Sequence, residues 1–139
     1  MKALIQRVTN AKVHINRTTK SSINKGLVIF IGFTDNDTFE TIEWVVQKIA
    51  KLRIFTDKEG KMNNSIEDVQ GELLIIPQFT LYASVKKGTR PSFIKAAETV
   101  LAEKLYNYFI EYACKQTTLN VETGSFGACL LYTSPSPRD

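Results

Sequence analysis

The stretch GLVIFIG, residues 26–32, decides the fold class of this chain. Its interior residues are all apolar, and a glycine stands at each end of the run. A strand covered on one face alternates apolar with polar residues, whereas a continuous apolar run of this length is typical of a strand buried on both faces. A second run, GELLIIP at residues 71–77, predicts another buried strand, in which Pro77 must end the ladder or sit at a bulge because proline has no N–H.

Two helices are predicted to accompany these strands. Asp37 is a good N-cap and Glu40 follows three residues later, as in a capping box, so we expect a helix from about residue 38 to residue 52. A last helix is expected from about residue 98 to residue 115. Residues at helical spacing form its predicted buried face, namely Leu101, Leu105, Tyr108, Phe109 and Tyr112.

The remaining apolar segments are short. They predict further strands at residues 4–8, 13–15, around 23, and 120–123. Strands and helices are mixed without a strict βαβ alternation, so the sequence predicts an α+β domain with a mixed, largely antiparallel sheet and two main helices. With 139 residues, 43% of them hydrophobic, the chain has the size and composition of one globular domain.

Charge and cysteine content place few limits on function. A net charge of +4 permits a nucleic-acid partner without requiring one. No apolar run approaches the roughly 20 residues of a membrane span, so we expect no membrane association. Cys114 and Cys129 have neither metal-like nor redox-like spacing, and Cys114 is expected to pack on the last helix. Few thiols favour a reducing cytoplasm as the location.

The usual catalytic groups are scarce. The single histidine, His14, follows Val13 in a predicted strand, where a half-exposed strand residue is the preferred interpretation and a general base the alternative. Glu67, Asp68 and Glu72 are interpreted as a solvated loop in preference to a pair of catalytic acids. The sequence contains no phosphate-binding loop motif and no metal-ligand cluster, so we expect no metal and no cofactor.

One polar and aromatic patch interrupts the strand pattern. The stretch PQFTLY, residues 77–82, is followed closely by KKGTRPSF, residues 86–93. Aromatic rings can stack on bases and lysine or arginine can contact phosphates, so this patch could hold an adenosine and its phosphates. The pattern alone leaves this hypothesis level with the alternative of a strand end and an exposed loop.

Short blocks along residues 1–128 resemble the D-aminoacyl-tRNA deacylase family. The blocks are IQRV (5–8), KGL (25–27), KLRIF (51–55), GKMN (60–63), QFTLY (78–82), RPSF (90–93) and TGSFGA (123–128). The resemblance implies the family's fold, and a cytoplasmic homodimer with its active site at the subunit interface. It implies hydrolysis of the ester between a D-amino acid, or glycine, and the terminal adenosine of tRNA, without a metal. A noncatalytic RNA-binding module remains the alternative.

The resemblance also implies roles for individual residues. Gln78, Phe79 and Thr80 are expected to line the pocket for the aminoacyl-adenosine, and the backbone N–H groups of Phe79 and Thr80 are the candidate oxyanion donors. Lys86 and Lys87 are expected to meet tRNA phosphates, with a solvated loop as the equal alternative. The residues expected to border or support the pocket are Arg90, Pro91, Ser92 and Phe93.

This sequence departs from the family pattern at two places. Pro77 stands where the family has a serine, so a hydroxyl and an N–H are missing there. The family also carries a Gly-Pro motif with a cis peptide that enters the partner's pocket and excludes L-amino acids, and this sequence has no Gly-Pro dipeptide. Residues 129–139, CLLYTSPSPRD, can be encoded by a stretch resembling a transposase adapter used for sequencing libraries. We therefore expect residues 1–128 to be a deacylase domain without its last strand, and residues 129–139 to be a non-native tail.

We predict that the chain 1–139 discriminates poorly between enantiomers, because the Gly-Pro motif that provides the family's chiral filter is missing. The measurement is the rate of ester cleavage on D-tyrosyl-tRNA and on L-tyrosyl-tRNA under the same conditions. We expect little or no enantioselective activity. Robust cleavage of the D-ester with the L-ester spared would contradict this prediction.

Overall fold

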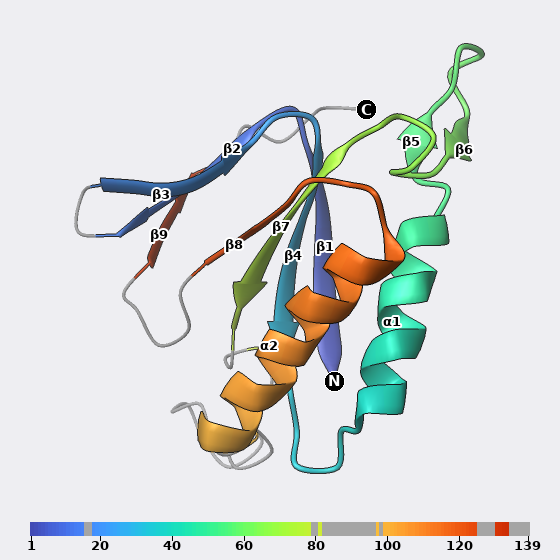
Figure 1. Ribbon diagram of the computed structural model, residues 1–139. Helices are drawn as coiled ribbons and strands as arrows, with labels where there is room; N and C mark the ends of the chain where they lie inside the picture. Colours follow the sequence, from blue (N-terminus) through green and yellow to red (C-terminus); the bar gives the residue numbers. More distant parts are fainter. Residues whose placement is uncertain (16–17, 79–80, 82–96, 98, 125–129, 134–139) are drawn as a thin grey trace, which may run out of the picture.

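A computed structural model describes residues 1–15, 18–78, 81, 97, 99–124 and 130–133 (Figure 1). Its main sheet has the strand order β1-β4-β7-β8. The bounds of these strands are β1 (Lys2–Val8), β4 (Gly26–Gly32), β7 (Glu72–Pro77) and β8 (Val121–Thr123). β1 runs antiparallel to β4, whereas β4 with β7 and β7 with β8 are parallel pairs.

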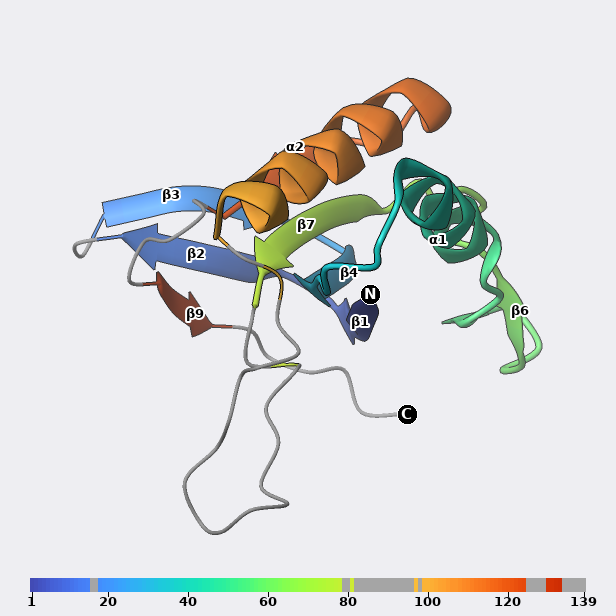
Figure 2. The ribbon, with the colours of Figure 1, turned by 90° about the horizontal axis from the view of Figure 1, so that it is seen from below.

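Two smaller sheets and two helices complete the described structure. The helices α1 and α2 lie over one face of the main sheet (Figure 2). All pairs in the smaller sheets are antiparallel, so the predicted α+β domain with a mixed, largely antiparallel sheet is confirmed. The bounds are β2 (Ala11–Ile15), β3 (Thr18–Ile23), β9 (Leu130–Thr133), β5 (Phe55–Thr56), β6 (Met62–Asn64), α1 (Phe39–Lys51) and α2 (Thr99–Gln116).

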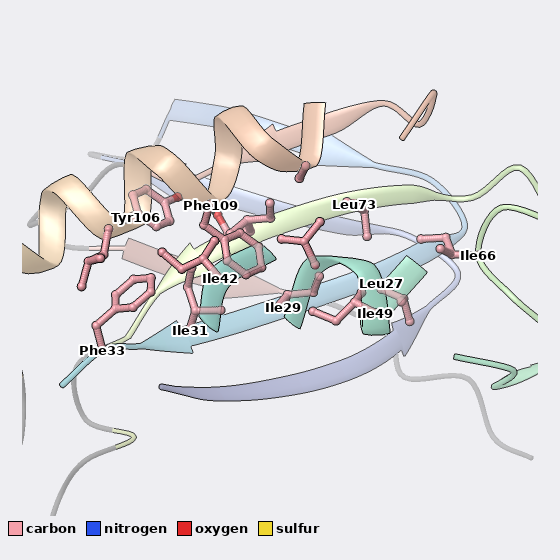
Figure 3. Packing of buried hydrophobic residues seen from close by; sticks show 14 of the residues in the cluster. Leu27, Ile29, Ile31, Phe33, Ile42, Ile49, Ile66, Leu73, Tyr106 and Phe109 are labelled. Atoms are coloured by element: carbon pink, nitrogen blue, oxygen red, sulfur yellow. Dashed lines mark hydrogen bonds between the residues drawn. The ribbon is translucent and has the colours of Figure 1, made fainter. Parts of the chain in front are cut away.

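Strand β4 is buried on both faces, as the run GLVIFIG predicts. Leu27, Ile29 and Ile31 point into the core between the sheet and the two helices (Figure 3). Val28 belongs to a second core, which the strands β2 and β3 close on the opposite face. The predicted second strand, β7, divides its residues in the same way, with Leu73 in the first core and Leu74 in the second.

Helix α1 begins one residue later than the capping prediction. Thr38 is the N-cap, and its hydroxyl accepts a hydrogen bond from the Thr41 N–H at 3.3 Å. Asp37 is not the cap, because its carboxylate instead accepts the Thr34 N–H at 2.8 Å and pairs with the Met1 ammonium. Trp44 lies on the exposed side of α1, opposite the buried Ile42.

Helix α2 buries a face rotated from the predicted one. Leu105 and Phe109 are buried as expected, together with Tyr106 and Ala113, which the prediction omitted. The expectation that Cys114 packs on the helix is wrong, because this residue follows Ala113 on the helix and is turned about 100° away from it into solvent. The helical period was correct, but Leu101, Tyr108 and Tyr112 of the predicted stripe are only half buried and pack against the edge of the core.

The strand β9 lies within residues 129–139, the segment expected to be a non-native tail. Its residues 130–133 pair antiparallel with β2, from Lys12 opposite Thr133 to Ile15 opposite Leu130. Backbone pairing is independent of side-chain identity, so it does not reveal where this segment comes from. The origin of residues 129–139 stays a prediction.

The approach of β7 to β4 leaves no room for a side chain at Gly26. A Cβ atom built there would lie 1.9 Å from the carbonyl oxygen of Glu72. Gly26 and Glu72 are the first pair of the parallel register, and the Glu72 N–H donates to the Lys25 carbonyl at 3.0 Å. A side chain at this position would push the two strands apart where their pairing begins.

We predict that Gly26→Ala lowers the free energy of unfolding by at least about 3 kcal/mol, because the clash is with backbone atoms that cannot rotate away. Urea denaturation followed by far-ultraviolet circular dichroism measures this change. The matched control is Gly60→Asn. Gly60 has a φ of +80° with open space around its Cα, and asparagine tolerates this conformation, so we expect a change below about 1 kcal/mol. Equal stability of Gly26→Ala and the parent would contradict the prediction.

Candidate active site

Three parallel strands end at one edge of the main sheet. Because β4 pairs in parallel with β7, and β7 with β8, their carboxyl ends lie side by side. The last residues of these strands are Gly32, Pro77 and Thr123, and we call their position the carboxyl edge. Sheets with parallel strands place their ligand sites outside this kind of edge.

Gln78 is the first residue beyond β7 and lies exposed at the carboxyl edge. Its N–H donates to the Ile31 carbonyl at 2.7 Å, so the hydrogen-bond ladder continues past Pro77. The Leu81 N–H approaches the Gln78 carbonyl at 3.4 Å, and the ammonium of Lys2 donates to the Leu81 carbonyl at 3.0 Å. The backbone of Gln78 is therefore held from both sides while its side chain faces solvent.

The chain returns to the same edge at Ala97. The Ala97 N–H donates to the Phe33 carbonyl at 2.8 Å, two residues beyond the carbonyl that accepts the Gln78 N–H. The chain therefore leaves the sheet at Gln78 and returns at Ala97, and both residues bond to carbonyls near the end of β4 that lie two residues apart. The other predicted site residues lie outside the described residues; they are Phe79, Thr80, Lys86, Lys87, Arg90, Pro91, Ser92 and Phe93.

An ion pair fastens the loop that follows β4. The Met1 ammonium lies 2.7 Å from Asp37 Oδ1, and their side chains are only 1% and 7% exposed. The other carboxylate oxygen of Asp37 accepts the Thr34 N–H. This pair links the start of β1 to the loop between Phe33 and α1, next to the point where Ala97 joins. No local sequence pattern predicts this contact, because the two residues are far apart in the chain and carry no shared motif.

Tyr106 joins the ends of β7 and β8 from the helix above them. Its hydroxyl lies 2.8 Å from the Ile75 carbonyl oxygen and 2.9 Å from that of Gly124, and the residue is 2% exposed. The Ile75 carbonyl also accepts the Gly124 N–H at 2.9 Å. On the other side of β8, the Ser21 hydroxyl donates to the Thr123 carbonyl at 2.7 Å. The end of β8 is therefore hydrogen-bonded to α2 on one face of the sheet and to β3 on the other.

The remaining titratable candidates lie away from the carboxyl edge. His14 is a half-exposed residue of β2, which agrees with the preferred interpretation. The Asp68 carboxylate accepts the Ser65 N–H at 2.8 Å, and this bond lowers the pKa of its carboxyl, while the Asp68 N–H donates to the Ser65 hydroxyl at 3.2 Å. Glu72 begins β7 and accepts the Asn24 N–H at 2.9 Å, at the opposite end of the strand from Gln78. These carboxylates have local structural roles in turns and at a strand start.

Two further properties concern only the part of the chain that the structure describes. Within residues 1–15, 18–78 and the shorter described segments, no three histidine, cysteine, aspartate or glutamate side chains come together as metal ligands would. Neither described helix has the length and apolar character needed to cross a membrane.

Comparison with known proteins identifies the family. A sequence model described as D-Tyr-tRNA(Tyr) deacylase matches residues 4–133. This chain belongs to that family. The membership confirms the resemblance seen in the sequence blocks.

Individual relatives of this deacylase cover nearly the whole chain. Proteins named D-aminoacyl-tRNA deacylase from Clostridium kluyveri and Thermosipho africanus are 50% and 49% identical to it, over 94% and 92% of this chain and 87% and 85% of theirs. A solved structure of the c-Myc DNA Unwinding Element Binding Protein is 38% identical, with a TM-score of 0.91 over 96% of this chain and 91% of that one. A probable eukaryotic D-amino acid tRNA deacylase, 21% identical with a TM-score of 0.81 over 96% and 92%, shares the fold.

We predict that Tyr106→Phe lowers the free energy of unfolding by about 1–2 kcal/mol, measured by urea denaturation. In this variant the Ile75 carbonyl still accepts a hydrogen bond from the Gly124 N–H. The buried carbonyl of Gly124 loses the hydrogen bond from the tyrosine hydroxyl. The matched control is Tyr108→Phe on the same helix, whose half-exposed hydroxyl donates to Glu43 at 3.1 Å. We expect a smaller loss there, because water can replace this bond. Equal losses in the two variants would contradict the role assigned to Tyr106.

The same variant should change the alkaline limb of the stability curve. Burial raises the pKa of Tyr106 above its ordinary value, so the folded state favours the neutral hydroxyl. The resulting contribution to the free energy of unfolding is fully present below about pH 10. It decreases as the pH rises further, because the tyrosine then ionises more readily in the unfolded state. Tyr106→Phe should therefore lose less stability than the parent between about pH 9 and about pH 11.

Proposed function

We propose that this protein hydrolyses the ester that links a D-amino acid, or glycine, to the terminal adenosine of tRNA, a chiral proofreading step in translation. The observation that carries the proposal is the family match over residues 4–133. Relatives about half identical over most of both chains bear the name D-aminoacyl-tRNA deacylase, which supports the same activity here. The protein would thus act as an ester hydrolase on aminoacyl-tRNA.

The proposed site is the carboxyl edge with the segment that starts at Gln78. Water adds to the ester carbonyl carbon, and the resulting oxyanion accepts hydrogen bonds from the N–H groups of Phe79 and Thr80. The tetrahedral intermediate then expels the ribose oxygen, which takes up a proton. An aminoacyl ester is already activated, so oriented donors and a positioned water can suffice, with help from the neighbouring ribose hydroxyl. The fixed backbone of Gln78 supports this assignment, because it sets where Phe79 begins.

The remaining roles complete the proposal. Arg90, Pro91, Ser92 and Phe93 border the pocket, and Lys86 and Lys87 contact tRNA phosphates. The enzyme acts as a cytoplasmic homodimer with the pocket at the subunit interface, and it uses no metal or cofactor. The hydrogen bonds of Gln78 and Ala97 to Ile31 and Phe33 support a site at the carboxyl edge, because both ends of the segment are held there.

A noncatalytic nucleic-acid-binding module is the second candidate function. One observation favours the binding module: the solved structure 38% identical to this chain is named for binding a DNA unwinding element. A binding module would use the aromatic ring of Phe79 and the nearby lysines without ester chemistry.

The deciding experiment measures release of tyrosine from D-tyrosyl-tRNA, with tRNA binding measured in parallel. The enzyme proposal expects hydrolysis well above the spontaneous rate. It also expects cleavage of the minimal ester of D-tyrosine with adenosine, which carries the reacting bond without the rest of the tRNA. Binding of tRNA with neither ester cleaved, also in a chain whose C-terminus is restored from a relative, would favour the binding module.

We predict that Pro77→Ser changes the deacylation rate only modestly. The Gln78 N–H already bonds to the Ile31 carbonyl at 2.7 Å, so the segment after β7 is anchored without help from residue 77. The measurement is the rate of D-tyrosyl-tRNA cleavage by the parent and the variant. A rise of several orders of magnitude in the variant would show that the serine hydroxyl or its N–H is essential to the reaction.

A further inference from the structure

The outer face of helix α1 carries an exposed tryptophan followed by lysines. Trp44 is 65% exposed, which is unusual for so large an apolar side chain. Lys48 and Lys51 follow at helical spacing on the same face, and both are exposed. This face lies opposite the buried Ile42 and Val46, so it points directly away from the core.

The same surface continues beyond the end of α1 into the hairpin of β5 and β6. Arg53 is exposed, and its Nε donates to the Asn63 carbonyl at 3.0 Å, which ties it to β6. The turn between the two strands carries the exposed Lys58 and Lys61. Figure 1 shows this hairpin next to the carboxyl end of α1. We call the whole surface the basic stripe; its residues are Trp44, Lys48, Lys51, Arg53, Lys58 and Lys61.

The four lysines of the basic stripe are exposed, and the acidic residues near them in sequence include Glu40, one turn before Trp44 on α1, and Asp57 and Glu59 in the hairpin turn. In the described part of the chain none of them has an ion-pair partner; the ion pairs there are Met1 with Asp37 and Lys115 with Glu111. The nearby carboxylate of Asp57 accepts the N–H groups of Glu59 and Lys61, and these bonds lower its pKa. That carboxylate serves the turn of the hairpin instead of pairing with a lysine.

We propose that the basic stripe holds the phosphate backbone of the tRNA stem while the acceptor end reaches the carboxyl edge; this rests on the proposed function. Lysines contact the phosphates of the stem without reading sequence, and Trp44, the residue of the stripe closest to the start of α1, can stack on an unpaired base of the single-stranded acceptor end. Lys48 and Lys51 lie about 5 Å apart along the helix axis, so they can contact neighbouring phosphates of one strand. Helix α1 starts just after β4, so the basic stripe runs along α1 away from the carboxyl edge.

The first test uses Trp44, the only tryptophan of the chain, as a reporter. Uncharged tRNA is titrated into the protein, and the emission of Trp44 and its quenching by iodide are followed. We expect reduced emission and protection from iodide at the concentrations at which fluorescence anisotropy of labelled tRNA shows binding. Binding of tRNA without any change at Trp44 would overturn the proposal. Protection of Trp44 by phosphatidylserine vesicles but not by tRNA would also overturn it, in favour of a membrane surface.

The second test removes charge from the stripe. The double variant Lys48→Gln/Lys51→Gln should bind tRNA about tenfold more weakly than the parent at about 50 mM salt, and the slope of log affinity against log salt should fall by about 1.8. The matched control is Lys12→Gln, the same change at an exposed lysine of β2. Its affinity and slope should stay near those of the parent. If the double variant and the control behave alike, the stripe does not contact tRNA.

The minimal ester of D-tyrosine with adenosine separates this proposal from the proposed function. It has no stem, so the parent and the double variant should cleave it at equal rates. If the parent cleaves neither this ester nor D-tyrosyl-tRNA, the proposed function fails, whereas the two binding tests still decide whether the stripe holds tRNA. If the variant loses cleavage of the minimal ester, its effect on tRNA would come from a disturbed site and the proposal would be wrong.

Discussion

The backbones of β4 and β7 approach so closely at Gly26 that no side chain fits between them. This contact sets the parallel register in which Ile29 lies opposite Ile75 and Ile31 opposite Pro77. Both strands are interior, and each contributes alternate residues to two cores, one under the helices and one under β2 and β3. The carboxyl edge follows from this pairing, because only parallel strands deliver their last residues to the same side of a sheet.

The carboxyl edge is organised by backbone groups more than by charged side chains. The carbonyls at the end of β4 receive the N–H groups of Gln78 and Ala97, so the segment between them begins and ends at defined points. Tyr106 and Ser21 hold the exit of β8 from opposite layers. Such a frame suits a reaction on an activated ester, in which oriented backbone donors can replace a nucleophile or a metal.

The two sides of helix α1 carry different kinds of side chain. Between α1 and α2, Phe39 stacks on Tyr108 with ring centroids 4.1 Å apart, and the Tyr108 hydroxyl donates to Glu43. That side lines an open groove whose charged residues are Glu103, Lys104 and Glu111. The face of α1 turned away from the core carries Lys48 and Lys51. The exposed lysines of α1 thus lie on its outer face, whereas the groove side carries charges of both signs.

The sequence by itself determined the elements, because periodicity and turn residues are local properties. The runs 26–32 and 71–77, the helical spacing along α1, and the short sequence blocks were enough for the fold class and the family. The tertiary structure alone decided that β4 and β7 run parallel, that Asp37 binds the Met1 ammonium instead of capping α1, and that Tyr106 is buried while Tyr108 is half exposed. Each depends on a partner far along the chain, and a local pattern has no information about that partner.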